Sequence, residues 1–264
     1  MPNEGTRSLP RILTIAKNAF REAVRDRILY NLIVFVLLIT VSAIFLGELT
    51  AGQESRVIIN LGLSSVLLFG SFIAVFVGVS LVWKEIEKKT VYSIFSKPIG
   101  RGEFIVGKYL GLCATLFVNV MIMGVGVTLA LAYVGGASQT ASVWGAIYLI
   151  FLELTILTAV AIMFSSFSTP ALSALLTFFV FLIGHFSASL LDLATTLGSQ
   201  SAIAVFTAIY YTLPNLSNFS FIINAAHGDV PTLSYAGFAT VYAFGFDAVL
   251  LAITVLIFSK RNFK

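Results

Sequence analysis

The sequence has few charged residues and almost no cysteine. Only 11% of its 264 residues are Asp, Glu, Lys or Arg, whereas a soluble domain carries about a quarter. The single cysteine, Cys113, excludes a disulfide framework within the chain. The Cys, Met and His residues show no metal-ligand spacing, so we expect no metal site. The sequence as a whole is 58% hydrophobic, with a mean hydropathy of +0.99. Composition therefore predicts an integral membrane protein, and nucleic acid is not an expected partner.

Long apolar runs divide the chain into predicted membrane-spanning helices. About 20 apolar residues cross the hydrocarbon core of a bilayer as an α-helix. No internal repeat or low-complexity linker interrupts the pattern, so residues 1–264 form one predicted all-α transmembrane domain. We expect six spans, at about 30–47, 57–83, 109–134, 143–164, 171–191 and 235–258.

The basic residues set the predicted topology. With six spans and a cytoplasmic N-terminus, every Lys and Arg except Arg56 falls on the cytoplasmic side, as the positive-inside rule requires. The apolar segment 201–213 is too short to span, and a seventh span there would place the basic C-terminal tail outside. We therefore expect both termini in the cytoplasm. Residues 192–234 are predicted to be external, as short helices that cap or dip into the outer leaflet.

Residues 10–29 have the pattern of an amphipathic helix. Lys17, Arg21 and Arg25 recur at i, i+4 and i+8 on one face. Such a helix is predicted to lie in the membrane interface, with its cations near lipid headgroups and its apolar face in the acyl boundary. The alternative is a solvated charged helix that leads into the membrane. The predicted apolar face consists of Ile12, Ile15, Ala16, Ala19, Phe20 and Ala23.

Three ionisable side chains fall within the predicted spans. Glu153 is in the fourth, His185 in the fifth and Asp247 in the sixth. A charge at the centre of a spanning helix costs about 2.5–3.5 kcal/mol on insertion scales, so each should face a partner or a wet cavity, or be protonated. They are candidates, with Asn119, for lining a translocation path or proton relay. The alternative is a structural hydrogen bond between helices.

Residues 84–108 form a charged region between the second and third spans, which we predict to be a cytoplasmic coupling region. Its 102–108 stretch matches a G-x-x-x-x-G-K phosphate loop, but Tyr109 stands where that loop needs Ser or Thr. No catalytic residue is expected in this chain. Helical spacing places Val91, Ile94 and Phe95 on one face, with Glu87 one turn earlier. A cytoplasmic loop has no core of its own, so this apolar patch either lies on the membrane surface or docks into a partner.

The charged region resembles the signature of type-2 ABC exporter permeases. The segments EIEKKT at 85–90, KP at 97–98, Arg101 and FIVGKYLG at 104–111 are similar to its E-x-E-x-G-T, P-x-x-R and G-K-x-x-G parts. Lys89 replaces the glycine that is usual before the threonine. The 100–111 stretch is similar to the permease branch associated with copper-enzyme maturation and gliding machinery.

The resemblance implies a half-transporter of a bacterial or archaeal cytoplasmic membrane. Two permease subunits, expected to be identical, would work with two ATPase subunits that hold ATP and magnesium, and this chain would hold no cofactor. A periplasmic protein is a further candidate partner. Two alternatives remain: an ion-coupled carrier using Glu153 and Asp247, or a subunit that passes ATPase motion to a periplasmic partner without solute flux. The residues implied to contact the ATPase are Glu85, Glu87, Thr90, Val91, Ile94, Phe95, Pro98 and Arg101.

Overall fold

The computed structural model is all-α. It describes residues 4–25, 27–50, 52–87, 100–197 and 200–260, and every element within these ranges is a helix. The prediction of an all-α membrane protein is confirmed. In chain order the elements are α1 (Glu4–Val24), α2 (Arg27–Glu48), α3 (Glu54–Glu87), α5 (Arg101–Tyr133), η1 (Ala137–Gln139), α6 (Thr140–Ser165), α7 (Pro170–Leu197), α8 (Gln200–Thr212), η2 (Leu216–Phe219), α9 (Ile222–Ala226) and α10 (Leu233–Lys260).

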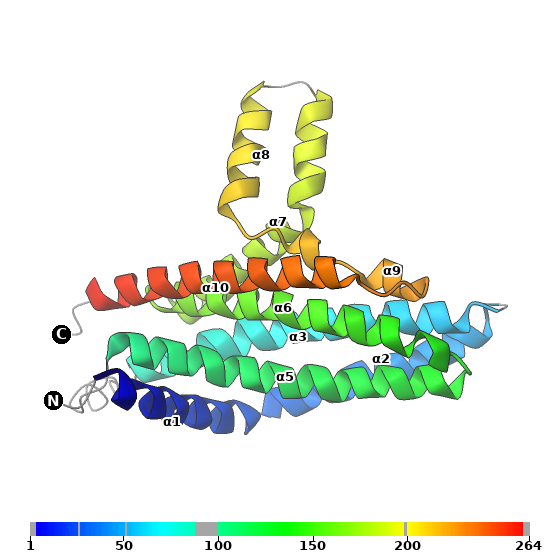
Figure 1. Cartoon of the computed structure of the whole chain (residues 1–264), viewed down its shortest axis with the longest axis horizontal. Coiled ribbons are helices and arrows are strands. Elements are labelled where there is room, and N and C mark those ends of the chain that lie inside the picture. The colour runs from blue at the N-terminus through cyan, green and yellow to red at the C-terminus, as the bar shows by residue number, and fades with distance from the viewer. Residues whose placement is uncertain (1–3, 26, 51, 88–99, 198–199, 261–264) are drawn as a thin grey trace.

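Long helices run alongside one another down the length of the molecule, and the beginning of α1 and the end of α10 lie at the same end of this bundle (Figure 1). Among the described residues, six helices are long and apolar enough to cross a membrane, which confirms the number predicted. The third begins at residue 101, not 109, because α5 is helical from its first polar turn onward. The six segments are Tyr30–Glu48, Glu54–Ser80, Arg101–Tyr133, Ala137–Ser165, Pro170–Ser187 and Leu233–Lys260.

Helix α6 is the central element of the bundle. It contacts α3, α5, α7 and α10, and most of its side chains are buried. Glycines of α3 allow its backbone to approach closely. A Cβ atom added at Gly70 would stand 2.6 Å from Leu154 Cδ1, and one at Gly78 would stand 3.0 Å from the Ala161 Cβ. Small residues on one face thus position a neighbouring helix, as in other membrane bundles.

Helix α1 packs against α5, which changes the predicted role of its apolar face. A Cβ at Gly111 would stand 2.5 Å from the Ala16 carbonyl oxygen and 2.6 Å from the Ala19 Cβ. Ala19 is fully buried. This part of the face therefore contacts protein, because the glycines of α5 admit another backbone, and not the acyl boundary as predicted. Leu9 and Leu13 are the exposed apolar residues of α1. The helix also starts earlier than residue 10 and ends before residue 29.

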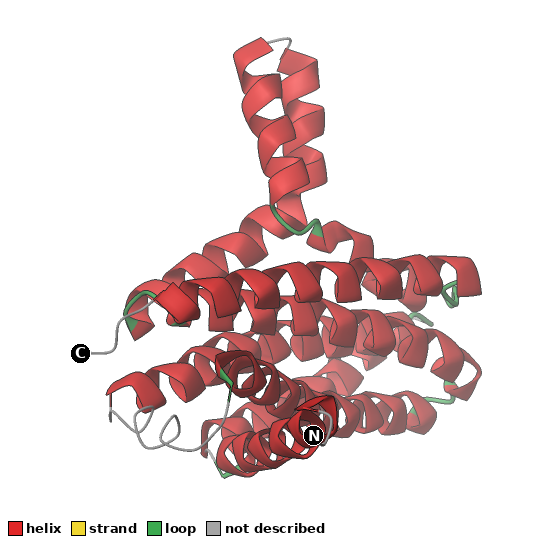
Figure 2. Ribbon diagram, turned by 60° about the vertical axis from the view of Figure 1, so that its left-hand side comes forward, coloured by secondary structure: helices red, strands yellow, loops and turns green. Residues whose placement is uncertain are grey.

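The region predicted to be an external segment at 192–234 is divided in the structure. Its first residues continue α7, and the end of α7 pairs with α8 in a hairpin that stands away from the bundle (Figures 1 and 2). The second half packs onto the bundle, with Leu216, Phe219 and Ala225 buried. Asn215 anchors this half, because its side-chain oxygen accepts from Ser187 Oγ at 3.1 Å.

The glycine contact of α1 and α5 gives a prediction for stability. Gly111→Ala forces the backbone of α1 away from α5, and we expect a loss of about 1–3 kcal/mol, as for other overpacked sites. Gly245→Ala is the matched control, because a Cβ there meets nothing within 4 Å. Thermal unfolding of the purified protein measures both. Equal midpoints for the two variants would contradict the close α1–α5 contact.

Candidate functional site

The residues predicted to contact an ATPase lie only partly in the described structure. Thr90, Val91, Ile94, Phe95 and Pro98 lie outside the described residues. Glu85 and Glu87 belong to the last turn of α3, and Arg101 is the first residue of α5. In the chain, the segment 88–99 therefore follows α3 and precedes Gly100 and α5.

The start of α5 is a capped helix and not a loop. Gly100 is the N-cap, and the Glu103 carboxylate accepts a hydrogen bond from its backbone N–H at 2.9 Å. This contact satisfies one of the amide groups that a helix leaves unpaired at its beginning. The last eight residues of the predicted coupling region 84–108 therefore belong to α5. A phosphate loop at 102–108 is excluded, since its backbone is helical.

Arg101 fastens the beginning of α5 to the end of α10. Its guanidinium donates hydrogen bonds to the carbonyl oxygens of Phe258, at 3.2 Å, and Ser259. A cation at a helix C-terminus is favourable, because the last carbonyl groups there have no partner within the helix. One turn along α5, the Phe104 ring stacks on the Phe258 ring with centroids 5.9 Å apart. Sequence reasoning missed this role of Arg101, which depends on a contact with residues about 157 positions later.

Two ion pairs hold α1 on the same stretch of α5. Arg11 Nη1 lies 3.8 Å from Glu103 Oε2, and Lys108 Nζ lies 3.5 Å from Glu22 Oε2. Lys108 is buried, and its ammonium also lies 5.8 Å from the centroid of the Phe104 ring. We refer to residues 100–111 of α5, with their partners on α1 and α10, as the α5 junction.

Asp247 lies at a point where three helices meet. Its Oδ2 accepts a hydrogen bond from Tyr109 Oη of α5 at 2.7 Å and from Thr155 Oγ1 of α6 at 3.0 Å. The Asp247 side chain is 3% exposed. The arrangement connects α5, α6 and α10 through one carboxyl group. Tyr109 carries a polar hydroxyl at the start of the third predicted span, and this was visible in the sequence. Its partner, Asp247, could not be read from the sequence.

Glu153 and His185 form a second, separate polar contact. Glu153 Oε1 lies 3.4 Å from His185 Nδ1, across the interface of α6 and α7. Glu153 is 1% exposed. Within the described ranges, neither of its carboxylate oxygens has a hydrogen-bond partner. Asp247 differs in that its Oδ2 accepts two hydrogen bonds, although its Oδ1 has no hydrogen-bond partner among the described residues.

The four candidates for a translocation path do not form one chain of contacts. Asn119 donates to the Thr115 carbonyl oxygen of its own helix at 2.7 Å, which satisfies its amide locally. In the part of the chain that the structure describes, no hydrogen bond joins Asn119, the Asp247 cluster and the Glu153–His185 pair to one another. The sequence thus identified polar positions inside the membrane, and the structure separates them into three places.

The Asp247 cluster gives a second prediction. Tyr109→Phe removes one hydrogen bond to Asp247, and interhelical bonds in membrane proteins average about 0.6 kcal/mol and reach about 1.7. We expect a loss in that range by thermal or denaturant unfolding. Tyr133→Phe on the same helix is the control, since Tyr133 is 77% exposed. If the Tyr109 variant is as stable as the control, the hydrogen bond contributes nothing to packing of α5 on α10.

The comparisons agree with this architecture over almost the whole chain. A family model described as "ABC-2 family transporter protein" matches residues 13–263. No match to a curated protein was found. The matched range includes α5, the junction residues other than Arg11, and all six apolar helices. The chain belongs to the ABC-2 family of transporter proteins, and it is the membrane-embedded permease component of an ABC transporter.

Proposed function

We propose that this chain is the permease subunit of an ABC exporter whose energy comes from ATP hydrolysed by separate ATPase subunits. The observation that carries the proposal is the α5 junction. The segment that resembles the ATPase-contacting part of such permeases, 88–99, leads directly into residues that fasten α5 to α1 and to α10. A force applied to that segment therefore acts on three helices together.

In this mechanism the ATPase moves the coupling segment, and α5 carries the movement into the membrane. Residues Glu85 to Pro98 seat in a cleft of the ATPase, with Val91, Ile94 and Phe95 as apolar anchors. Each of them contributes about 1.5–3 kcal/mol if it is fully buried. Arg101 transmits the movement to α10, and Glu103 and Lys108 transmit it to α1. Such coupling requires two arrangements of the bundle that ATP binding favours differently.

The proposal includes a second permease subunit, identical in sequence, and an ATPase dimer that binds ATP and magnesium. It places the protein in a bacterial or archaeal cytoplasmic membrane with both termini on the cytoplasmic side. The shared position of α1, the start of α5 and the end of α10 supports one side for all three. The positive-inside distribution supports the cytoplasm as that side.

The docking step is tested by a charge placed on the apolar patch. Phe95→Asp puts a carboxylate into the proposed ATPase cleft, and we expect loss of ATPase recruitment with normal membrane insertion. Ser93→Asp is the matched control, because helical spacing puts residue 93 on the opposite face. Pulldown of the partner ATPase from detergent extracts measures recruitment. Normal recruitment by the Phe95 variant would refute docking through this patch.

The transmission step is tested separately at Arg101. Arg101→Gln removes the charge that holds the end of α10 but leaves residues 88–99 unchanged. We expect the ATPase to bind this variant normally, whereas transport-linked ATP hydrolysis by the assembled complex falls about tenfold or more. Arg56→Gln, which removes an exposed arginine of α3 outside the junction, is the control. Loss of ATPase binding in the Arg101 variant would assign Arg101 to docking instead.

A further inference from the structure

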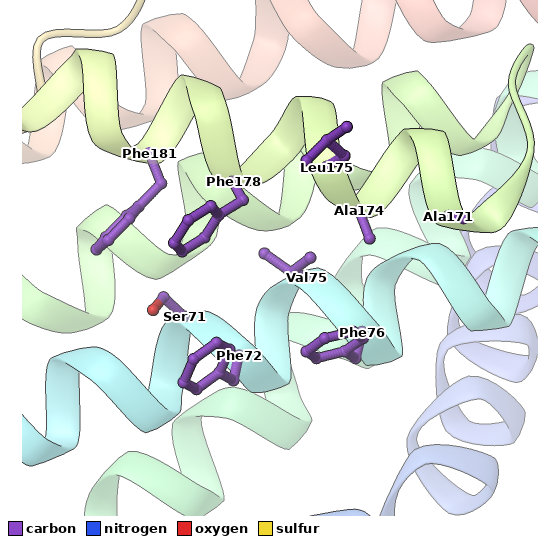
Figure 3. A pocket seen from close by; sticks show the side chains of 9 residues that line it. All are labelled: Ser71, Phe72, Val75, Phe76, Ala171, Ala174, Leu175, Phe178 and Phe181. Carbon is purple, nitrogen blue, oxygen red and sulfur yellow. The ribbon is translucent and has the colours of Figure 1, made fainter.

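A groove opens between α3 and α7 (Figure 3). It has a volume of about 380 Å³, within the range of pockets that bind small organic molecules. Aromatic rings dominate its lining, and the rings of Phe72 and Phe178 face each other across it (Figure 3). Its lining residues lie within two of the segments long enough to span a membrane. The lining consists of Ser71, Phe72, Val75, Phe76, Ala171, Ala174, Leu175, Phe178 and Phe181.

The lining of the groove favours a ligand with a large apolar part. Ser71 is the one hydroxyl in its lining, and its Oγ already donates to the Leu68 carbonyl oxygen at 2.7 Å. Phe76 and Leu175 are about half exposed, so the groove is open to the surroundings of the bundle. A molecule dissolved in the bilayer can therefore enter it from the side. Lining of this kind gives affinity by apolar burial and by contact with ring faces.

The Glu153 carboxylate lies close to the groove, and His185 stands between it and Phe181 of the lining. Phe181 lines the groove, and its ring centroid lies 4.8 Å from that of His185. His185 Nδ1 in turn lies 3.4 Å from Glu153 Oε1. Across the ranges that the structure describes, Glu153 accepts no hydrogen bond on either oxygen. A buried acceptor without a partner is costly, and a ligand that brings a donor removes that cost.

We propose that the groove and Glu153 together bind an amphipathic organic amine in its protonated form. The aromatic or alkyl body lies between α3 and α7, against Phe72, Phe178 and Phe181. The ammonium group donates to Glu153 and takes the place of the His185 imidazole beside it. Aromatic faces next to the ammonium add cation–π attraction. This inference rests on the proposed transport function, because it names the chemical class of the substrate.

An amine explains the features better than the other ligands that an apolar groove accepts. A neutral hydrocarbon chain fits the lining but leaves both Glu153 oxygens unpartnered. An anion brings acceptors and no donor, so it also leaves both Glu153 oxygens unpartnered, and it repels that side chain whenever the carboxylate is ionised. A protonated amine supplies donors and a positive charge at once, and charge-assisted hydrogen bonds are the stronger ones.

The test compares three probes that share one ring system. These are 1-naphthylmethylamine, which is a cation at neutral pH, neutral 1-naphthylmethanol, and anionic 1-naphthylacetate. Binding to the full chain in nanodiscs of zwitterionic lipid is measured by equilibrium dialysis, and empty nanodiscs give the lipid background. We expect saturable binding of the amine, at least about tenfold tighter than that of the alcohol or the carboxylate. This charge selectivity in the unmodified protein depends on no variant.

Variants assign the binding to residues. Glu153→Gln keeps the side-chain size and removes the carboxylate, so amine affinity should fall about tenfold, which corresponds to about 1.4 kcal/mol. Asp192→Asn, which changes an exposed carboxylate of α7 outside the groove, should bind the amine normally. Phe178→Leu should weaken binding about threefold, whereas Phe179→Leu should not. Phe179 is about half exposed on the same helix and does not line the groove. Each variant is first shown to be monodisperse with an unfolding midpoint near that of the unmodified protein.

Three results would overturn the proposal. The first is the absence of saturable amine binding, and the second is equal binding of all three probes, which indicates a site for hydrocarbon alone. The third is unchanged amine affinity in the Glu153 variant. Neither an ATPase nor transport enters this assay. Failure here therefore leaves the proposed permease function standing, and failure of the ATPase pulldown leaves the binding site standing.

Discussion

A polar group inside the hydrocarbon layer has to find its partner within the protein, and this constraint shapes the whole bundle. Water does not solvate polar groups in this layer. Each polar side chain within a span therefore either forms a hydrogen bond within its own helix or connects two helices. Thr115, Asn119 and Thr128 on α5 take the first route and bond to carbonyl groups one turn earlier. Tyr109 and Asp247 take the second and connect α5 to α10.

Helix α5 depends most on this rule, because it begins with charged residues and ends in apolar ones. Arg101, Glu103 and Lys108 are all paired within this chain, with α10 in the first case and α1 in the others. The glycines between them let α1 approach closely enough for these pairs to form. The same residues thus fasten α5 to a neighbouring helix on each side.

The two acidic residues inside the membrane show how differently one residue type can be used. Asp247 accepts hydrogen bonds from two helices and belongs to the framework of the bundle. Glu153 is equally buried but accepts none in the described structure, and it lies behind an aromatic groove. Buried acceptors without partners cost stability, so their presence points to function more than to folding.

Sequence alone determined the number of spans and the fold class, because bilayer thickness and the 3.6-residue period act on each helix separately. It also found Glu153, His185, Asp247 and Asn119, since polar residues in apolar runs are evident without any structure. Tertiary structure decided which of them meet: Asp247 with Tyr109, Glu153 with His185, and Asn119 with its own helix. It also decided that the apolar face of α1 packs against α5 and that Arg101 forms hydrogen bonds with the end of α10. Such pairings join residues more than 80 positions apart in several cases, and no local pattern encodes a contact that forms only when helices pack.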